Sequence, residues 1–217
     1  MKVFSGDFYK IYRHQDIFVR VNIEYQDSAK WILSYLDSEI KKGASFRENE
    51  TIQIGWMTLI FKSNEIGGLE IYEPEFGSLP VNWIIGANNT IRHLTLQREV
   101  CEQAKVDAVY PSMRQSGVIS PLFFEKKQEF RMERDFSQGD DSGWIFRDDG
   151  YDDSNATHRS LYEIGCIVPA VIPFLALPPE TMVCRSRSNL EIVTPKINIS
   201  ALNNNFILKL MNSAYLS

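Results

Sequence analysis

The hydrophobic pattern of the chain changes near residue 105. Before that point, apolar residues recur over long segments with the regular periods of strands and helices. After it, short apolar stretches are interrupted by the turn-forming residues Pro111, Gly117, Pro121, Gly139, Gly143 and Gly150. The change predicts an N-terminal domain over residues 1–106 and a second domain that begins at residue 107. The chain has 217 residues, which is enough for two domains that each bury a hydrophobic core.

The N-terminal half begins with a strand and a helix. Residues 17–25 alternate apolar and polar side chains, which is the period of a half-buried strand. Apolar residues at helical spacing follow over residues 29–40. Asp27 can cap the N-terminus of this helix, and Gly43 can adopt the left-handed conformation just after its last turn. The sequence therefore predicts an amphipathic helix of about four turns.

Further strands and a second helix complete this half. The pattern predicts a long strand at residues 52–62 and another at 69–73, joined through the sequence Asn-Glu-Ile-Gly-Gly as an antiparallel pair. A second amphipathic helix begins at Asn88 or Asn89. Because strands and helices do not alternate as repeated βαβ units, we predict an α+β fold. Its N-terminal lobe has antiparallel strands and two helices, and a loop-rich, mainly β domain follows.

Composition excludes several classes of function. Lysine and arginine number 23 against 28 acidic residues, a formal charge of −5 that offers no broad basic surface to nucleic acid. The longest apolar run, at residues 167–179, is too short for a membrane span and is broken by prolines. Cys101, Cys166 and Cys184 are widely spaced and odd in number, which matches neither a zinc site nor a disulfide framework. We expect a cytoplasmic protein without a secretory signal, and the sequence indicates no oligomeric state.

Seven aspartates lie between residues 135 and 153, opposed only by Arg147. They are Asp135, Asp140, Asp141, Asp148, Asp149, Asp152 and Asp153. The local charge of −6 is compatible with a pair of solvated acidic loops, or with an acidic face that binds a basic partner. A calcium site is a third interpretation, although the sequence lacks the alternating ligand spacing and distal glutamate of an EF-hand loop.

No arrangement of residues predicts an active site. The chain contains no G-x-S-x-G nucleophile pattern, and Ser142 follows two acids that would repel a developing oxyanion. His14, His93 and His158 are expected to be surface or capping residues. We therefore predict no catalytic residues, no metal ligands and no cofactor.

The four tryptophans, Trp31, Trp56, Trp83 and Trp144, are expected to fill the core, because aromatic side chains bury large areas. Trp144 has a second interpretation. Its acidic neighbours favour a position near the surface, where it could anchor a protein interface.

The C-terminal half resembles a known family. Residues 140–153 read DDSGWIFRDDGYDD, and residues 161–185 read LYEIGCIVPAVIPFLALPPETMVCR. This order is similar to that of the immunity protein 33 family, in which a D-S-G-W-x-F core precedes an acidic stretch, a short helical segment, an I-P-F-L-like turn and a final strand. The matching positions are Asp141, Ser142, Gly143, Trp144 and Phe146, then Asp148, Asp149, Asp152 and Asp153, then Ile172, Pro173, Phe174 and Leu175.

The resemblance covers residues 107–195, leaves residues 196–217 as a C-terminal tail, and assigns no family to residues 1–106. The sequence differs from the family pattern in lacking a second glycine soon after the Gly-Trp-Ile-Phe segment. The resemblance implies a non-catalytic bacterial protein that binds and neutralises a cognate toxin in interbacterial competition. The partner-binding residues would then be Asp140, Asp141, Trp144, Asp148, Asp149, Asp152 and Asp153.

Two other functions remain open from the sequence. One is a general protein-binding or scaffold module. The other is a metal-dependent hydrolase that uses the aspartates between Asp140 and Asp153.

Overall fold

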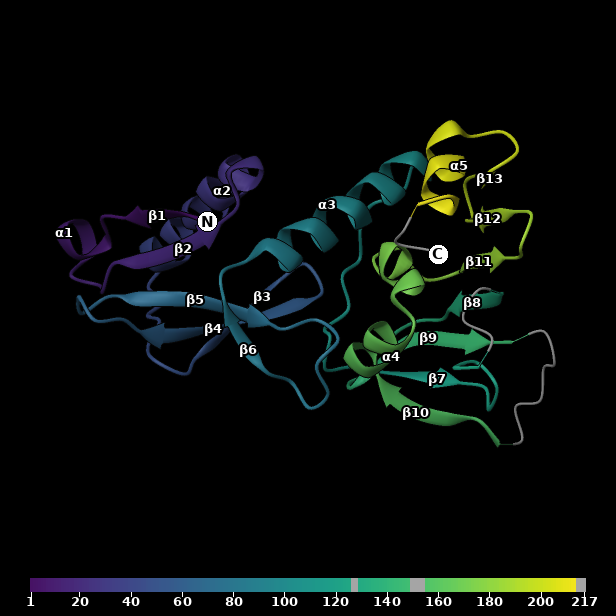
Figure 1. The fold of residues 1–217 in the computed structure, drawn as a ribbon, viewed down its shortest axis with the longest axis horizontal. Coiled ribbons are helices and arrows are strands. Elements are labelled where there is room, and N and C mark those ends of the chain that lie inside the picture. The colour runs from purple at the N-terminus through teal and green to yellow at the C-terminus, as the bar shows by residue number, and fades with distance from the viewer. Residues whose placement is uncertain (126–128, 149–154, 214–217) are drawn as a thin grey trace. The chain divides into compact units, whose positions relative to one another are not determined.

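A computed structural model describes residues 1–125, 129–148 and 155–213 of the chain. The residues group into two compact units, Met1–Leu94 and Thr95–Ser217. The division falls within the long helix α3 (Asn88–Gln103). Both units combine a mixed β-sheet with helices, so the predicted α+β class is confirmed (Figure 1).

The first unit is built on a six-stranded sheet with the order β1-β2-β5-β4-β3, in which β6 also pairs with β5. The strands are β1 (Lys2–Gly6), β2 (Ile17–Val21), β3 (Thr51–Ile54), β4 (Met57–Ser63), β5 (Leu69–Pro74) and β6 (Trp83–Ile85). The β4–β5 pair is antiparallel, as predicted. The β2–β5 pair is parallel, which corrects the expectation of antiparallel strands alone.

Helix α2 covers one part of this sheet. The helical elements before α3 are α1 (Phe8–Tyr12), the 3-10 turn η1 (Ile23–Tyr25) and α2 (Gln26–Lys41). The apolar stripe of α2 packs against β1 and β2 and closes the core of the unit. Gly43 takes φ +102° after the helix, and its N–H bonds the carbonyl of Ile40 while Ala44 bonds that of Glu39. This is a Schellman ending, as the sequence predicts.

Three local predictions were wrong. The strand expected over residues 17–25 ends at Val21, because the chain turns into η1. The N-cap of α2 is Tyr25 rather than Asp27, whose carboxylate pairs with Lys30 instead. The single strand expected at 52–62 is a hairpin of β3 and β4 that turns at Gly55, where φ is +62°. A glycine with positive φ allows this tight turn inside an apolar run.

Glu73 of β5 anchors the start of α3. Its carboxylate accepts hydrogen bonds from the backbone N–H of Asn89 (3.0 Å) and from the N–H and hydroxyl of Thr90 (2.7 and 2.9 Å). Burial raises the pKa of Glu73 above its ordinary value, against the opposing effect of these bonds. The carboxylate thus satisfies N–H groups that a helix leaves unpaired at its first turn.

His93 is buried, which corrects the expectation that it is a surface or capping residue. Its Nδ1 accepts a hydrogen bond of 3.2 Å from the indole N–H of the buried Trp56, and its ring packs edge-on against Phe76 with centroids 4.8 Å apart. An imidazole that accepts through Nδ1 is neutral. Burial lowers the pKa of His93 to about 3.

The second unit contains a seven-stranded sheet with the order β10-β7-β9-β8-β11-β12-β13. The strands are β7 (Ser116–Ile119), β8 (Phe130–Arg134), β9 (Asp141–Arg147), β10 (Thr157–Ser160), β11 (Thr181–Arg185), β12 (Leu190–Val193) and β13 (Asn198–Ser200). Only the β7–β9 pair is parallel within this order. The unit is therefore mainly β, as its sequence predicts.

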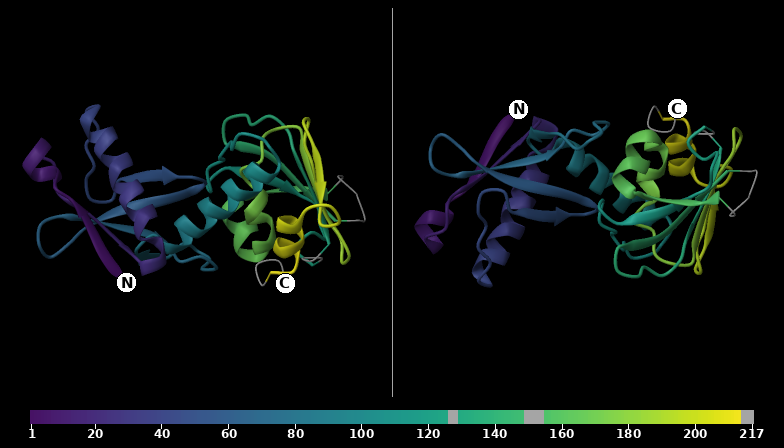
Figure 2. Two further views of the ribbon diagram at one scale, coloured as in Figure 1. Left: turned by 90° about the horizontal axis from the view of Figure 1, so that it is seen from above. Right: turned by 90° about the horizontal axis from the view of Figure 1, so that it is seen from below.

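Helical segments gather on one face of this sheet (Figure 2). They are α4 (Leu161–Ile167), the 3-10 segment η3 (Pro169–Phe174) and α5 (Asn205–Met211). Residues 169–174 are buried apart from Pro169, so the apolar run of the sequence forms the core beneath the sheet. Residues 196–213 add β13 and α5, and α5 packs against β12 and β13.

We predict that His93 makes the unfolding free energy depend on pH. Unfolded chains bind a proton at this residue near pH 6.5, whereas the native state does so only near pH 3. Its stabilisation is therefore present above pH 6.5 and is lost as the pH falls toward 3. Urea unfolding at pH 7 and pH 4.5 should show a loss of about 2 kcal/mol that is absent in His93→Gln.

The exposed His158 provides the control for this measurement. The variant His158→Gln should keep the pH dependence of the parent. An equal loss of stability in His93→Gln and in the parent would show that His93 titrates normally.

Candidate functional site

We call residues 135–153, which contain the seven aspartates, the acidic segment. Its first residues lie at the tip of a hairpin formed by β8 and β9. These strands pair antiparallel, with Arg134 opposite Trp144. At the end of the ladder the N–H of Asp135 donates to the carbonyl of Gly143 (2.9 Å), and Gln138 and Asp141 exchange two backbone hydrogen bonds of 3.0 Å. Residues 135–140 therefore form a short exposed connection.

Gly143 lets the two strands approach each other at this point. Its φ is +79°, and a Cβ atom there would lie 2.0 Å from the carbonyl oxygen of Asp135. Such a distance is far inside van der Waals contact, and L side chains rarely adopt this backbone conformation. Position 143 thus requires glycine for steric reasons.

Asp141 and Ser142 hold the backbone beside this glycine. Asp141 Oδ1 accepts from the N–H of Gly143 (2.9 Å). The buried Ser142 hydroxyl donates to the carbonyl of Ser116 (2.7 Å) and accepts from the N–H of Trp144 (3.3 Å). Both side chains therefore satisfy backbone groups where the β7–β9 ladder is irregular.

Trp144 is fully buried, so it fills the core as its residue type predicts. Its indole N–H donates to the carbonyl of Leu175 (3.0 Å), and its ring lies 6.1 Å from that of Phe146. Leu175 is the last residue of the Ile-Pro-Phe-Leu segment. The two parts of the sequence that carry the family resemblance are therefore in direct contact.

Arg134 is the residue that sequence reasoning missed. It is buried in the interior, where its guanidinium donates to the carbonyls of Val109 (2.7 Å), Leu175 (3.2 Å), Leu177 and Ser142 (3.4 Å). It also lies 5.5 Å from the centre of the Trp144 ring. Burial lowers the pKa of Arg134 to about 10. No carboxylate within the described ranges forms an ion pair with it.

The predicted partner-binding residues occupy different environments. Asp140 is exposed and Asp141 is half-buried at the hairpin tip. Trp144 and Asp148 are buried, and the Asp148 carboxylate accepts a hydrogen bond of 2.7 Å from the Ser120 hydroxyl. The positions of Asp149, Asp152 and Asp153 lie outside the described residues.

Phe136 at the hairpin tip is a further candidate. Its side chain is 64% exposed, and it lies in sequence between the exposed Asp135 and Asp140. Large aromatic side chains are unusual at such a level of exposure and are frequent anchors of protein interfaces. A phenylalanine within a turn-forming, polar segment was a sequence signal for this position.

The other sequence candidates have structural roles or lie apart. His14 bonds the backbone, with Nε2 accepting from the N–H of Phe46 (2.8 Å), and His158 is exposed on β10. Trp31 is 46% exposed on α2 and stacks on Tyr35, which corrects its placement in the core.

In the described ranges, no group of three or more histidine, cysteine or acidic residues could hold a metal ion. No disulfide joins the three cysteines, all of which lie in these ranges. No helix in those ranges is both long and apolar enough to span a bilayer.

Comparison with known proteins finds a family match within the second unit. The family model of the Imm33-like domain matches residues 96–195, which confirms the predicted resemblance to the immunity protein 33 family. The matched segment contains the β8–β9 hairpin, Arg134 and the Trp144–Leu175 contact. No curated protein and no solved structure matches the chain.

We predict that Trp144→Ala destabilises the second unit by about 3–5 kcal/mol, because it leaves a cavity and removes the indole hydrogen bond to the carbonyl of Leu175. Trp31→Ala, which truncates a half-exposed tryptophan, should cost far less. Denaturant unfolding of both variants gives the comparison. A Trp144→Ala protein as stable as the parent would contradict the core role of this residue.

Proposed function

We propose that the chain is a bacterial immunity protein that binds and neutralises a cognate protein toxin without catalysis. The observation that carries this proposal is the Imm33-like match over residues 96–195, which supports an immunity role for the second unit. The proposed setting is interbacterial competition, in which polymorphic toxins are delivered into neighbouring cells, for example by type VI secretion. The protein would act in the cytoplasm of the cell that makes it.

Neutralisation of this kind depends on affinity and shape. A protein that covers the active site or substrate-binding surface of a toxin needs an interface of about 1,600 Å² in total. A few aromatic or arginine side chains supply most of the binding energy, and surrounding charges steer the encounter. The second unit offers both kinds of group at the β8–β9 hairpin, namely the exposed Phe136 and the acidic residues beside it.

We assign the contact surface to the acidic segment. Asp140 and Asp141 at the hairpin tip would meet basic residues of the toxin, and Asp149, Asp152 and Asp153 extend the same negative charge along the sequence. Trp144 and Asp148 are buried and would act by holding the surface in place. Like charges in one segment repel one another, so a basic partner relieves that repulsion as well as attracting the segment.

The first test is protection from a toxin. The product of the gene beside this one should stop the growth of a bacterial host, and co-expression of this chain should restore growth and yield a complex on copurification. Absence of both protection and complex with that product would contradict the proposed function.

The contact surface is tested by binding kinetics. Changing Asp149, Asp152 and Asp153 to asparagine should slow association by about tenfold at low salt and flatten its salt dependence, because these charges steer the encounter. Asp148 is left unchanged because it bonds Ser120 in the interior. Phe136→Ala should instead speed dissociation, since an anchor acts after contact is made.

Matched controls come from exposed residues elsewhere in the chain. Neutralising Glu24, Asp27 and Glu102 removes the same charge, and Leu202→Ala truncates a side chain that is 82% exposed. Both control variants should bind as the parent does. If the aspartate variant associates at the rate of its control at low salt, the acidic segment is not the contact surface.

A further inference from the structure

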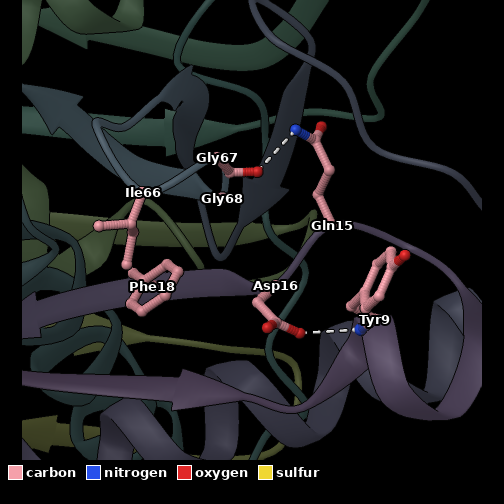
Figure 3. A pocket seen from close by; sticks show the side chains of 7 residues that line it. All are labelled: Tyr9, Gln15, Asp16, Phe18, Ile66, Gly67 and Gly68. Carbon is pink, nitrogen blue, oxygen red and sulfur yellow. Dashed lines mark hydrogen bonds between the residues drawn. The ribbon is translucent and has the colours of Figure 1, made fainter.

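The first unit contains a pocket of about 320 Å³ where β2 and β5 begin beside α1. Its lining includes Tyr9, Gln15, Asp16, Phe18, Ile66 and Gly67 (Figure 3). All of these residues precede the segment that the family model matches. The pocket is therefore a feature that the Imm33-like match does not account for.

The walls of the pocket differ in chemistry. Figure 3 shows the side chains of Phe18 and Ile66 on one side, the Tyr9 ring on the other, and the Asp16 carboxylate between them. The side-chain amide of Gln15 donates a hydrogen bond of 3.1 Å to the carbonyl of Gly67. The pocket thus combines aromatic walls with one acidic group.

The base of the pocket is fixed by close packing. A Cβ atom at Gly68 would lie 2.5 Å from the Phe18 ring and 2.8 Å from the carbonyl oxygen of Asp16. The neighbouring N–H of Leu69 donates to that same carbonyl (2.9 Å). The backbone that carries Asp16 is therefore held against the β4–β5 turn.

Several hydrogen-bond donors around the pocket are already used. The N–H groups of Ile66 and Gly68 both donate to Asn64 Oδ1 (3.2 and 2.8 Å), and that of Gly67 donates to the Asn64 carbonyl (3.2 Å). The Gln15 amide donates to Gly67, as described above.

Acceptors remain available. Asp16 Oδ1 accepts from the N–H of Tyr9 (2.8 Å), and this carboxylate forms no ion pair with any residue that the structure describes. The Gln15 side-chain oxygen is also an acceptor. Free acceptors and a negative charge favour a ligand that is cationic and rich in donors.

The aromatic walls favour the same kind of ligand. A cation within about 6 Å of an aromatic ring centre is attracted by the electrons of the ring face. The guanidinium of Arg13 already lies 5.5 Å from the centre of the Tyr9 ring, although Arg13 does not line the pocket. The Tyr9 ring therefore already takes part in one contact with a guanidinium.

We propose that this pocket binds an arginine side chain presented by another protein or peptide. The planar guanidinium would donate to the Asp16 carboxylate and the Gln15 oxygen, and its flat face would stack on Tyr9 or Phe18. The pocket is open to solvent, since Tyr9 is 58% and Ile66 76% exposed. Pockets for free small molecules enclose most of their ligand, so the open form favours a side chain whose backbone stays outside.

The test uses the whole chain and a capped arginine, N-acetyl-arginine methylamide. Titration followed by backbone amide NMR should give saturable shifts at Tyr9, Gly67 and Gly68. The neutral isostere N-acetyl-citrulline methylamide should bind at least about tenfold more weakly, because it lacks the charge that pairs with Asp16.

Two variants separate the pocket from general charge effects. Asp16→Asn retains an oxygen that can accept from Tyr9 N–H but removes the charge, so the affinity for capped arginine should fall about tenfold. Glu65→Gln removes the same charge from the adjoining turn, outside the pocket lining, and should leave that affinity unchanged.

Three results would overturn the proposal. They are equal binding of capped arginine and capped citrulline, equal binding by Asp16→Asn and the parent, and tighter binding of free N-propylguanidine, which carries the same single charge, than of capped arginine. The last would assign the pocket to a small molecule. Because the titration contains no toxin, its outcome is independent of whether the second unit neutralises one.

Discussion

The buried guanidinium of Arg134 is the interaction on which the second unit depends. A cation without a counterion in a protein interior is costly unless hydrogen bonds replace its hydration. Arg134 meets that requirement with carbonyl groups alone, from Val109, Ser142, Leu175 and Leu177. These carbonyls come from segments distant in sequence, so a single side chain joins the approach to β7, strand β9 and the turn after η3.

The Asp-Ser-Gly-Trp sequence is built around this arginine. Asp141 and Ser142 satisfy backbone groups, Gly143 admits the close approach of Asp135, and Trp144 contacts both Arg134 and Leu175. The sequence that carries the resemblance to the family therefore maintains the fold of this unit. Residues at the hairpin tip, such as Phe136 and Asp140, are exposed and less constrained by packing. In our account, recognition of a partner can change at the tip while the motif beneath it stays the same.

The regular elements of the fold could be predicted from sequence, because burial imposes a period on them. Helix α2 follows its apolar stripe and ends at Gly43 as expected. The β3–β4 hairpin could not be found this way, since apolar residues continue through its turn at Gly55. Burial of His93 was also missed, because its partners Trp56 and Phe76 come from other segments.

The candidate sites were less predictable than the fold. Charge alone indicated the acidic segment, but burial of Asp148 depends on Ser120, a residue distant in sequence. The sequence did contain a signal that Arg134 is buried. This residue continues the alternation of the buried Phe130 and Met132 along β8. No sequence pattern indicated the arginine pocket proposed for the first unit, because its walls come from two segments, residues 9–18 and 66–68, that are distant in sequence.

The most direct test of this account is the unfolding free energy of Arg134→Lys. Lysine keeps the positive charge but lacks the planar fork of N–H donors by which arginine reaches four carbonyls. We therefore expect the unfolding free energy to fall by about 3 kcal/mol or more. Arg131→Lys, at an exposed position on the same strand, should change stability by less than about 0.5 kcal/mol. If Arg134→Lys were as stable as Arg131→Lys, the carbonyl contacts of Arg134 would not hold the domain together.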